Sequence, residues 1–324
     1  MIETVHAWGE QLVTLHQRIG RHFRRAEPRR RALAYLQALI SPSERKNGWQ
    51  LAETIGDATP DGVQRLLNAA RWDADDLRAY VVEQLADSNA VLVIDETSFR
   101  KRGDKSVGVQ EQYCGTTREI ENCQVAVFLY YASEDSGAFI DRALYLPQNW
   151  TRDRTRRDEA GVPDTVQFAT KPEIACAMLE RTFAAGVRAQ WVAADCLYGC
   201  DRRLRSWLKQ RYQRYVLAIR STDLVPRDSC WSLSAKYVAE DFANGEWQRL
   251  SAGAGTKGPR LFDWAWRELP YASDGRDEQG WGRMAAGAAQ RRGSNGAGVL
   301  PGLCAAGDNY PGRGRRGEWD SLGH

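Results

Sequence analysis

The chain has 324 residues, 43% of them hydrophobic and 27% charged, and a formal net charge of +3. Its length predicts two or three domains, and no stretch approaches the roughly 20 apolar residues that cross a membrane. With so small a net charge, any attraction to nucleic acid must come from local basic patches. The first residues, Met1–Thr4, lack the basic-then-apolar start of a signal sequence, so we expect a cytoplasmic protein that does not contact a membrane.

The cysteines and histidines do not predict a zinc site. The seven cysteines are irregularly spaced and form no C-x-x-C pair, and His6, His16 and His22 fall in the first predicted helix. Structural zinc sites need closely spaced ligands of these types. We therefore expect reduced, unpaired cysteines, as is usual inside the cell.

Residues 1–88 are predicted to be helical. Apolar residues recur about every 3.6 positions from Trp8 to Ile19, which predicts one apolar helix face. Basic residues then gather at Arg24, Arg25, Arg29, Arg30, Arg31, Arg45 and Lys46. Such a cluster predicts contact with DNA phosphates, although a solvated helix face has the same composition. The short helices expected over 43–88 are similar to helix-turn-helix DNA readers, and a helical bundle that does not contact DNA is the alternative.

Two apolar runs that end in an acid are the main candidates for a functional site. Val91–Ile94 is followed by Asp95 and Glu96, and Trp191–Ala194 is followed by Asp195. A continuous apolar run predicts a strand buried on both faces. The acids then fall at the C-terminal ends of the strands, where open α/β sheets place their ligands. A solvated turn is the alternative for one such acid, and the repetition of the pattern favours a site.

The order of the predicted elements indicates the fold. We expect strands over 91–95, 106–113, 123–131, 190–195 and 215–219, with the first three as an antiparallel meander and helices after the third and fourth. This β-β-β-α-β-α-β order is typical of an α/β fold with an RNase H-like mixed sheet, in which the first and fourth strands are neighbours. Asp95 and Asp195 would then lie side by side. Adjacent carboxylates repel unless cations hold them, and oxygen ligands suit Mg²⁺ or Mn²⁺, two of which can together cleave a phosphodiester.

The sequence also resembles a family, the bacterial insertion-sequence transposases with a DDE catalytic domain, called DDE superfamily endonucleases. The resemblance covers roughly residues 1–282. The motifs that carry it are Glu44–Asn47, Val93–Thr97, Ser106–Val109, Glu121–Val125, Leu144–Pro147, Thr170–Glu173 and Ala194–Gly199.

The resemblance implies cleavage and strand transfer at transposon ends, with two Asp and one Glu binding divalent metal. Asp95 matches the first acid and Asp195 the second, and Glu96 is expected to be structural. The implied partners are double-stranded DNA, as terminal inverted repeats and as target, and a second copy of the chain in a synaptic complex. The implied location is the bacterial nucleoid. Arg100, Lys101 and Arg102 are expected to face DNA phosphates, with a solvated loop as the alternative.

The C-terminal part departs from the family. Residues 223–282, after the catalytic core predicted over 89–222, fit a β-rich insertion between the second Asp and the Glu. From 283 to 324 the chain is rich in Gly, Ala and Arg with almost no apolar periodicity, which predicts an aberrant, disordered tail. We find neither the further strand nor the Glu-bearing helix expected there, and Glu318 stands on no helical pattern. Our hypothesis is a frameshift near codon 283, with a genuine disordered tail as the alternative.

The leading interpretation is a transposase that is defective because its third acid is missing. A non-catalytic protein that binds transposon ends and competes with a full-length enzyme is one alternative. An RNase H-like nuclease without preference for such ends is the other.

Overall fold

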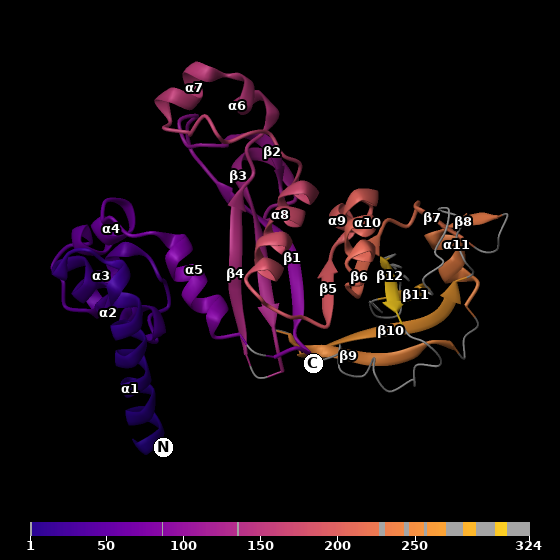
Figure 1. The fold of residues 1–324 in the computed structure, drawn as a ribbon, viewed down its shortest axis with the longest axis horizontal. Helices are drawn as coiled ribbons and strands as arrows, with labels where there is room; N and C mark the ends of the chain where they lie inside the picture. Colours follow the sequence, from indigo (N-terminus) through magenta and orange to yellow (C-terminus); the bar gives the residue numbers. More distant parts are fainter. Residues whose placement is uncertain are drawn as a thin grey trace. The chain divides into compact units, whose positions relative to one another are not determined.

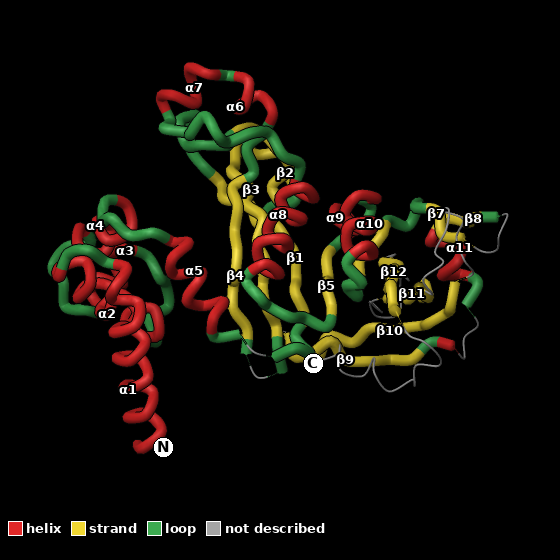
Figure 2. The backbone as a smooth tube through the Cα atoms, viewed as in Figure 1, coloured by secondary structure: helices red, strands yellow, loops and turns green. Residues whose placement is uncertain are grey.

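The computed structural model describes residues 2–85, 87–134, 136–226, 231–242, 246–255, 258–269, 281–289 and 302–309. They belong to two compact units, Met1–Leu85 and Ala86–His324. The first is all-helical and the second is built around strands (Figure 1, Figure 2). The domain boundaries predicted at 88, 222 and 282 stay predictions. Among the described residues, no helix is both long and apolar enough to cross a bilayer.

The first unit is a set of short helices around small apolar clusters. Its elements are α1 (Ile2–Ile19), the 3-10 helix η1 (Gly20–His22), α2 (Ala26–Ile40), α3 (Gly48–Thr54), α4 (Asp61–Asn68) and α5 (Ala74–Glu83). Ala38, Leu51 and Val63 are buried together where α2, α3 and α4 meet. The Asn47 side chain caps α3 by accepting from the Gln50 N–H at 3.0 Å, and Asp73 caps α5 in the same way. These caps satisfy main-chain N–H groups at the start of each helix and so fix where the helix begins.

The second unit contains one mixed sheet, which has ten strands among the described residues. The strands are β1 (Val91–Arg100), β2 (Gln110–Cys114), β3 (Glu119–Ala132), β4 (Gly137–Leu144), β5 (Trp191–Ala194), β6 (Tyr215–Ile219), β9 (Gln248–Gly255), β10 (Gly258–Leu269), β11 (Trp281–Ala289) and β12 (Gly302–Asn309). Their order is β2-β3-β1-β5-β6-β12-β11-β10-β9, with β4 beside β3. A separate pair is formed by β7 (Leu224–Pro226) and β8 (Ser232–Ser234).

The core of the sheet has the predicted RNase H-like arrangement. β1 pairs antiparallel with β3 and parallel with β5, and β5 pairs parallel with β6. The first and fourth predicted strands are therefore neighbours, as expected.

The meander differs from the prediction. β1 runs on to Arg100 instead of ending at 95, because it pairs with β3 along its whole length. The antiparallel neighbours of β3 are β1 and β4, and the short β2 pairs only with the first part of β3. β4 was not predicted, because its pattern includes the buried Asp141, which Arg181 of α8 (Lys171–Ala184) satisfies at 2.8 Å.

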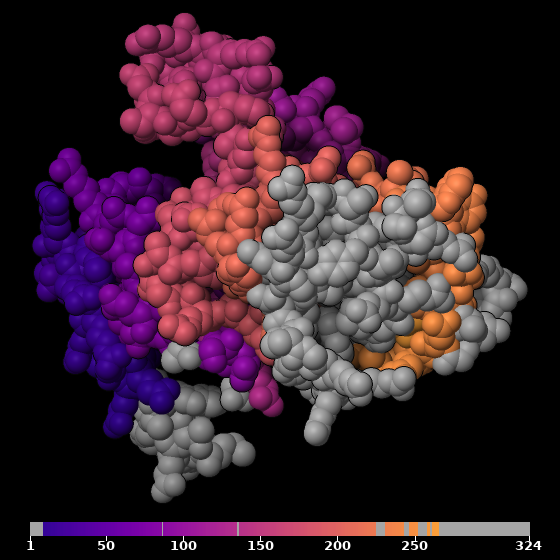
Figure 3. All heavy atoms as spheres, turned by 45° about the vertical axis from the view of Figure 1, so that its right-hand side comes forward, coloured from indigo at the N-terminus to yellow at the C-terminus, as the bar shows by residue number. Residues whose placement is uncertain are grey.

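Helices cover one face of the sheet. They are α8, α9 (Cys196–Gly199), α10 (Arg202–Gln210) and α11 (Ala235–Glu240). Leu92 and Ile94 of β1, Leu129 of β3 and Leu217 of β6 are buried on that face. Two further helices, α6 (Gln148–Arg152) and α7 (Arg154–Glu159), project beyond the ends of β2 and β3 (Figure 1, Figure 3). On the other face the side chains of Asp95 and Phe139 are exposed.

The expectation of no further strand after residue 283 is wrong. β11 and β12 pair antiparallel, and β12 continues the sheet by pairing with β6, from Leu303 opposite Ile219 to Gly307 opposite Tyr215. The prediction used apolar side-chain periodicity, whereas strand pairing uses main-chain N–H and C=O groups that Gly and Ala also carry. The rest of the predicted tail, including Glu318, lies outside the described residues.

Candidate active site

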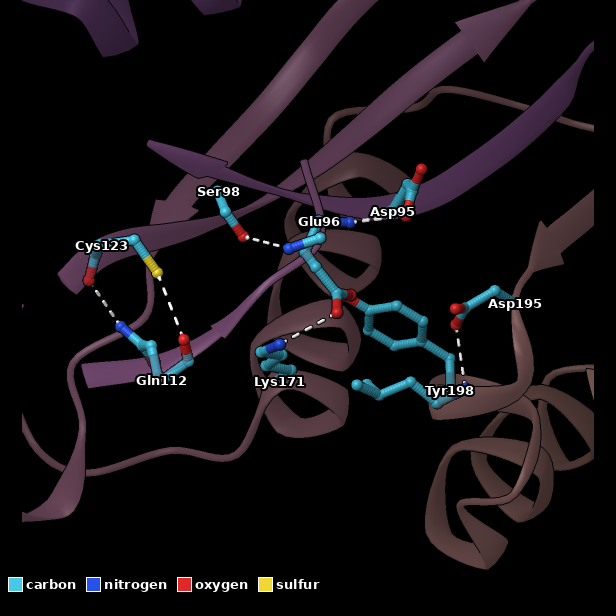
Figure 4. Close-up of polar contacts among 10 residues, drawn as sticks. Asp95, Glu96, Ser98, Gln112, Cys123, Lys171, Asp195 and Tyr198 are labelled. Atoms are coloured by element: carbon cyan, nitrogen blue, oxygen red, sulfur yellow. Dashed lines mark hydrogen bonds and ion pairs between the residues drawn. The ribbon is translucent and has the colours of Figure 1, made fainter. Parts of the chain in front are cut away.

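Two aspartates lie where the pairing of two adjacent parallel strands ends, Asp95 within β1 and Asp195 directly after β5. The pairing of β1 with β5 runs from Val91 opposite Trp191 to Ile94 opposite Ala194. Asp95 and Asp195 each come next in the chain, so they are neighbours where the β1–β5 pairing ends (Figure 4). Both residues are exposed at the surface, although neighbouring atoms partly desolvate their carboxylates. The parallel pairing therefore brings the two predicted acids together.

Main-chain N–H groups orient both carboxylates. Asp95 Oδ1 accepts from the N–H of Glu96 at 2.8 Å. Asp195 Oδ1 accepts from the N–H of Leu197 at 2.9 Å and so caps the start of α9.

The surroundings of both acids disfavour their negative charge. Partial burial raises the pKa of Asp95, and the charge of Glu96 acts in the same direction. Partial burial also raises the pKa of Asp195, and the charges of Glu96 and Asp95 add to this. The pKa of Asp95 is lowered in part by the Glu96 N–H and by the Lys171 ammonium, and that of Asp195 by the Leu197 N–H. A divalent cation would relieve the remaining repulsion.

Glu96 points to the opposite face of β1 from Asp95, because side chains alternate along a strand. Its Oε1 accepts from Lys171 Nζ at 2.9 Å, and its Oε2 accepts from the Tyr198 hydroxyl at 2.7 Å. Figure 4 shows Glu96 extending toward these two partners while Asp95 extends away from them. Both oxygens of Glu96 are thus engaged by other residues of the protein.

Lys171 and Tyr198 are residues to which the sequence assigned no role. Lys171 is the first residue of α8, whose start is fixed by a capping box between Thr170 and Glu173. Tyr198 is fully buried in α9, three residues after Asp195. The spacing of Tyr198 from Asp195 could have indicated this role. A residue three positions after a helix N-cap lies about one turn further on, on the same side of the helix as the cap.

The described residues hold no group of three or more acids, cysteines or histidines that could bind a metal ion. Asp223, which follows β6, is held by Cys200 at 2.8 Å and by Arg220 at 3.2 Å. Asp263 lies on β10, four strand spacings or roughly 19 Å from β5, and pairs with Arg249 at 2.8 Å. Neither acid completes the site of Asp95 and Asp195.

The structure divides the predicted DNA-contacting residues of the first unit into two sets. Arg29 donates to the Gly20 and Phe23 carbonyls, at 2.9 and 3.0 Å. Arg31 bridges Glu27 and Asp57, and Lys46 donates to the carbonyls of Ala38 and Ser41. The second set has exposed side chains that make no hydrogen bond or ion pair with other described residues, and it consists of Arg24, Arg25, Arg30 and Arg45.

The basic residues after Asp95 are also divided. Arg100 lies in β1 and forms an ion pair with Glu121 at 2.7 Å. Lys101 and Arg102 follow the strand, and both are exposed. Asn122 fixes this turn by donating to the carbonyls of Lys101 and Gly103, at 3.0 and 2.8 Å. Of these three basic residues, Lys101 and Arg102 have side chains that make no hydrogen bond or ion pair with another described residue.

The fold and the paired aspartates agree with a comparison to known families. Residues 18–230 match the family described as DDE superfamily endonuclease, and the chain belongs to this family. Such endonucleases generally use divalent metal ions, and their activity implies DNA binding. A curated relative, "Probable transposase for insertion sequence element IS701" from Microchaete diplosiphon, is 30% identical over 205 residues. The match covers 60% of this chain and 51% of the relative, so the chain spans about half the length of that protein.

Proposed function

We propose that the chain is a transposase-type endonuclease that cleaves phosphodiester bonds at insertion-sequence ends, with Asp95 and Asp195 as its metal-binding carboxylates. The observation that carries this proposal is the parallel pairing of β1 with β5, which ends one residue before both acids and so makes them neighbours. Family membership and the name of the similar protein support the reaction class.

The side chains of Asp95 and Asp195 fit a divalent metal ion. They offer carboxylate oxygens, which are the ligands that Mg²⁺ and Mn²⁺ prefer, and the pKa of each acid is raised by burial and neighbouring negative charge. When bound, two such ions supply an activated water or 3′-hydroxyl and stabilise the leaving oxygen. The role of Asp95 and Asp195 is to hold the metal, and the N–H groups of Glu96 and Leu197 orient them for it.

The DNA partner is double-stranded, as terminal inverted repeats and as target. Lys101 and Arg102 follow the far end of the strand that carries Asp95, roughly 20 Å along it, and would contact phosphates at a distance from the cleavage site. In the helical unit, Arg24, Arg25 and Arg30 have side chains available for phosphates. Binding of two ends would bring together two copies of the chain in a synaptic complex at the nucleoid.

We further propose that the centre is incomplete and the chain defective. Two acids leave one metal short of a ligand, so metal binding is weak and strand transfer is slight. The frameshift near codon 283 explains the loss, and it is tested by translating the gene in its other frames. If neither frame encodes a Glu-bearing helix, the frameshift explanation fails.

A second function, end binding without catalysis, is favoured by the exposed arginines of the separate helical unit. These side chains do not depend on the two aspartates. A chain that binds ends without cutting them would compete with an intact enzyme.

One experiment separates these functions. The full chain is incubated with Mg²⁺ and DNA that carries either the ends flanking its gene or scrambled ends, and both binding and nicking are measured. We expect end-specific binding by the unaltered chain, Asp95→Asn and Asp195→Asn, and weak nicking that both substitutions abolish. Asp158→Asn, an exposed acid of α7, is the matched control and should keep the nicking. Undiminished nicking by Asp95→Asn would contradict the catalytic role, and nicking without end preference would indicate an RNase H-like nuclease.

A further inference from the structure

The carboxylate of Glu96 connects three elements that are far apart in the sequence. Its two oxygens accept from Tyr198 in α9, at 2.7 Å, and from Lys171 in α8, at 2.9 Å, while Glu96 itself belongs to β1. The side chains of Glu96 and Lys171 are each 19% exposed, and Tyr198 is fully buried. Hydrogen bonds to a charged carboxylate that is shielded from water are short and strong. These contacts are therefore stronger than those of a solvent-exposed ion pair.

This link lies where the sheet stops connecting the two aspartates. The pairing between β1 and β5 ends at Ile94 and Ala194, one residue before each acid. Beyond that point, Glu96 is adjacent to Asp95, and Tyr198 is in the short helix that Asp195 caps. The Tyr198–Glu96 hydrogen bond thus continues the connection between the two chain segments past the last main-chain pair.

The helix that carries Tyr198 is also fixed from its other side. The N–H of Gly199 donates to the Asp195 carbonyl at 2.9 Å, which holds the turn closed. Gly199 lies directly against the main chain of β6 at Ala218. Packing against β6 and the hydrogen bond to Glu96 together restrict the movement of α9. Because Asp195 caps this helix, its position is restricted as well.

We infer that Tyr198 and Lys171 are positioning residues that act through Glu96 to set the separation of the Asp95 and Asp195 carboxylates. Tyr198 ties the two segments together, and Lys171 holds the Glu96 carboxylate in the orientation that Tyr198 requires. This inference rests on the proposed function, in which both aspartates hold a divalent metal ion. Loss of the Tyr198–Glu96 or the Lys171–Glu96 contact should let the distance between the Asp95 and Asp195 carboxylates vary, while both carboxylates remain present.

The test is a titration of the full chain with Mn²⁺ alone, in which electron paramagnetic resonance measures the free ion. Residues that orient metal ligands typically change metal affinity by 10–100-fold, so we expect Tyr198→Phe and Lys171→Met each to weaken Mn²⁺ binding about tenfold or more. Tyr113→Phe, at an exposed tyrosine of β2, and Lys105→Met, at an exposed lysine, are the matched controls and should bind as the unaltered chain does.

A double-substitution cycle distinguishes positioning from general stability. Tyr198→Phe should weaken Mn²⁺ binding in the unaltered chain and have no further effect in Glu96→Ala, because the two residues act through one contact. Thermal unfolding without metal, measured on each variant, gives the folded fraction at the titration temperature. An unchanged Mn²⁺ affinity of the folded Tyr198→Phe and Lys171→Met variants would overturn the inference, as would equal effects in both backgrounds. If Asp95→Asn and Asp195→Asn also bind Mn²⁺ as the unaltered chain does, the proposed function fails as well.

Discussion

Gly199 of α9 lies so close to Ala218 of β6 that a Cβ atom on Gly199 would stand 1.8 Å from the Ala218 carbonyl oxygen. Main-chain atoms on both sides leave no flexible side chain that could move aside. Gly199→Ala should therefore push α9 off the sheet, lowering the free energy of unfolding by about 1–3 kcal/mol and weakening Mn²⁺ binding through Asp195. Chemical denaturation and the Mn²⁺ titration measure the two effects.

The control for this substitution is Gly9→Ala. A Cβ atom on Gly9 meets nothing within 4 Å, and Gly9 lies inside a helix. The change should be neutral or stabilise by up to about 1 kcal/mol. Unfolding of Gly199→Ala at the same denaturant concentration as the unaltered chain would contradict the close packing of α9 on β6.

The two aspartates should lower the stability of the metal-free chain at neutral pH. The pKa of each aspartate is raised in the folded state, so folding favours the protonated carboxyl. Each aspartate therefore contributes stability below the ordinary aspartate pKa. This contribution is lost as the pH rises through the raised pKa. Asp95→Asn and Asp195→Asn should therefore be more stable than the unaltered chain at pH 7.5 without metal. The difference should shrink as the pH falls through the aspartate range. Denaturation with a chelator present at several pH values is the measurement, and variants less stable than the unaltered chain at pH 7.5 would contradict it.

Trp150 anchors the projecting helices α6 and α7. Its side chain is fully buried, its Nε1 donates to the Val109 carbonyl at 2.8 Å, and the Arg156 guanidinium lies 3.7 Å from its ring centroid. Trp150→Ala should cost about 3–5 kcal/mol, or make α6 and α7 sensitive to proteases while the sheet stays intact. The comparison is Trp49→Ala, since Trp49 is 60% exposed and its loss should change stability by about 0.5 kcal/mol or less. Similar costs for the two substitutions would show that Trp150 is not an anchor.

Neighbouring arginines of α2 should differ in what they do. Arg30→Ala should weaken DNA binding and lower the slope of log affinity against log salt by about 1, because one phosphate contact is lost. It should leave unfolding unchanged. Arg29→Ala should instead lower stability by about 1–2 kcal/mol, since the Gly20 and Phe23 carbonyls each lose the hydrogen bond from the guanidinium. Equal salt slopes for Arg30→Ala and the unaltered chain would remove Arg30 from the DNA interface.

The sequence predicted the strands that carry the two aspartates because each is a continuous apolar run that ends in an acid. It did not predict β4, where the buried Asp141 breaks the pattern and depends on Arg181, which lies far along the chain. Composition also could not distinguish Arg29 from Arg30. The guanidinium of Arg29 reaches the Gly20 and Phe23 carbonyls, whereas that of Arg30 donates to no described carbonyl. β11 and β12 were missed because main-chain pairing leaves no trace in side-chain periodicity.

The cluster around Glu96 was equally hidden. Lys171 and Tyr198 stand in motifs that the sequence analysis singled out, yet their common partner is evident only once α8 and α9 are folded against β1. The two ligands of a site can follow from local pattern, whereas the residues that hold them in place depend on tertiary structure.

The central claim, that Asp95 and Asp195 hold one divalent metal centre together, is tested most directly by Mn²⁺ titration of the full chain, of Asp95→Asn, of Asp195→Asn and of the double variant. Ligands of a shared centre act as a unit, so each single substitution should abolish most of the measurable binding and the double variant should lose no more than either. Unchanged Mn²⁺ affinity in either single variant, or losses that simply add in the double variant, would contradict a shared centre.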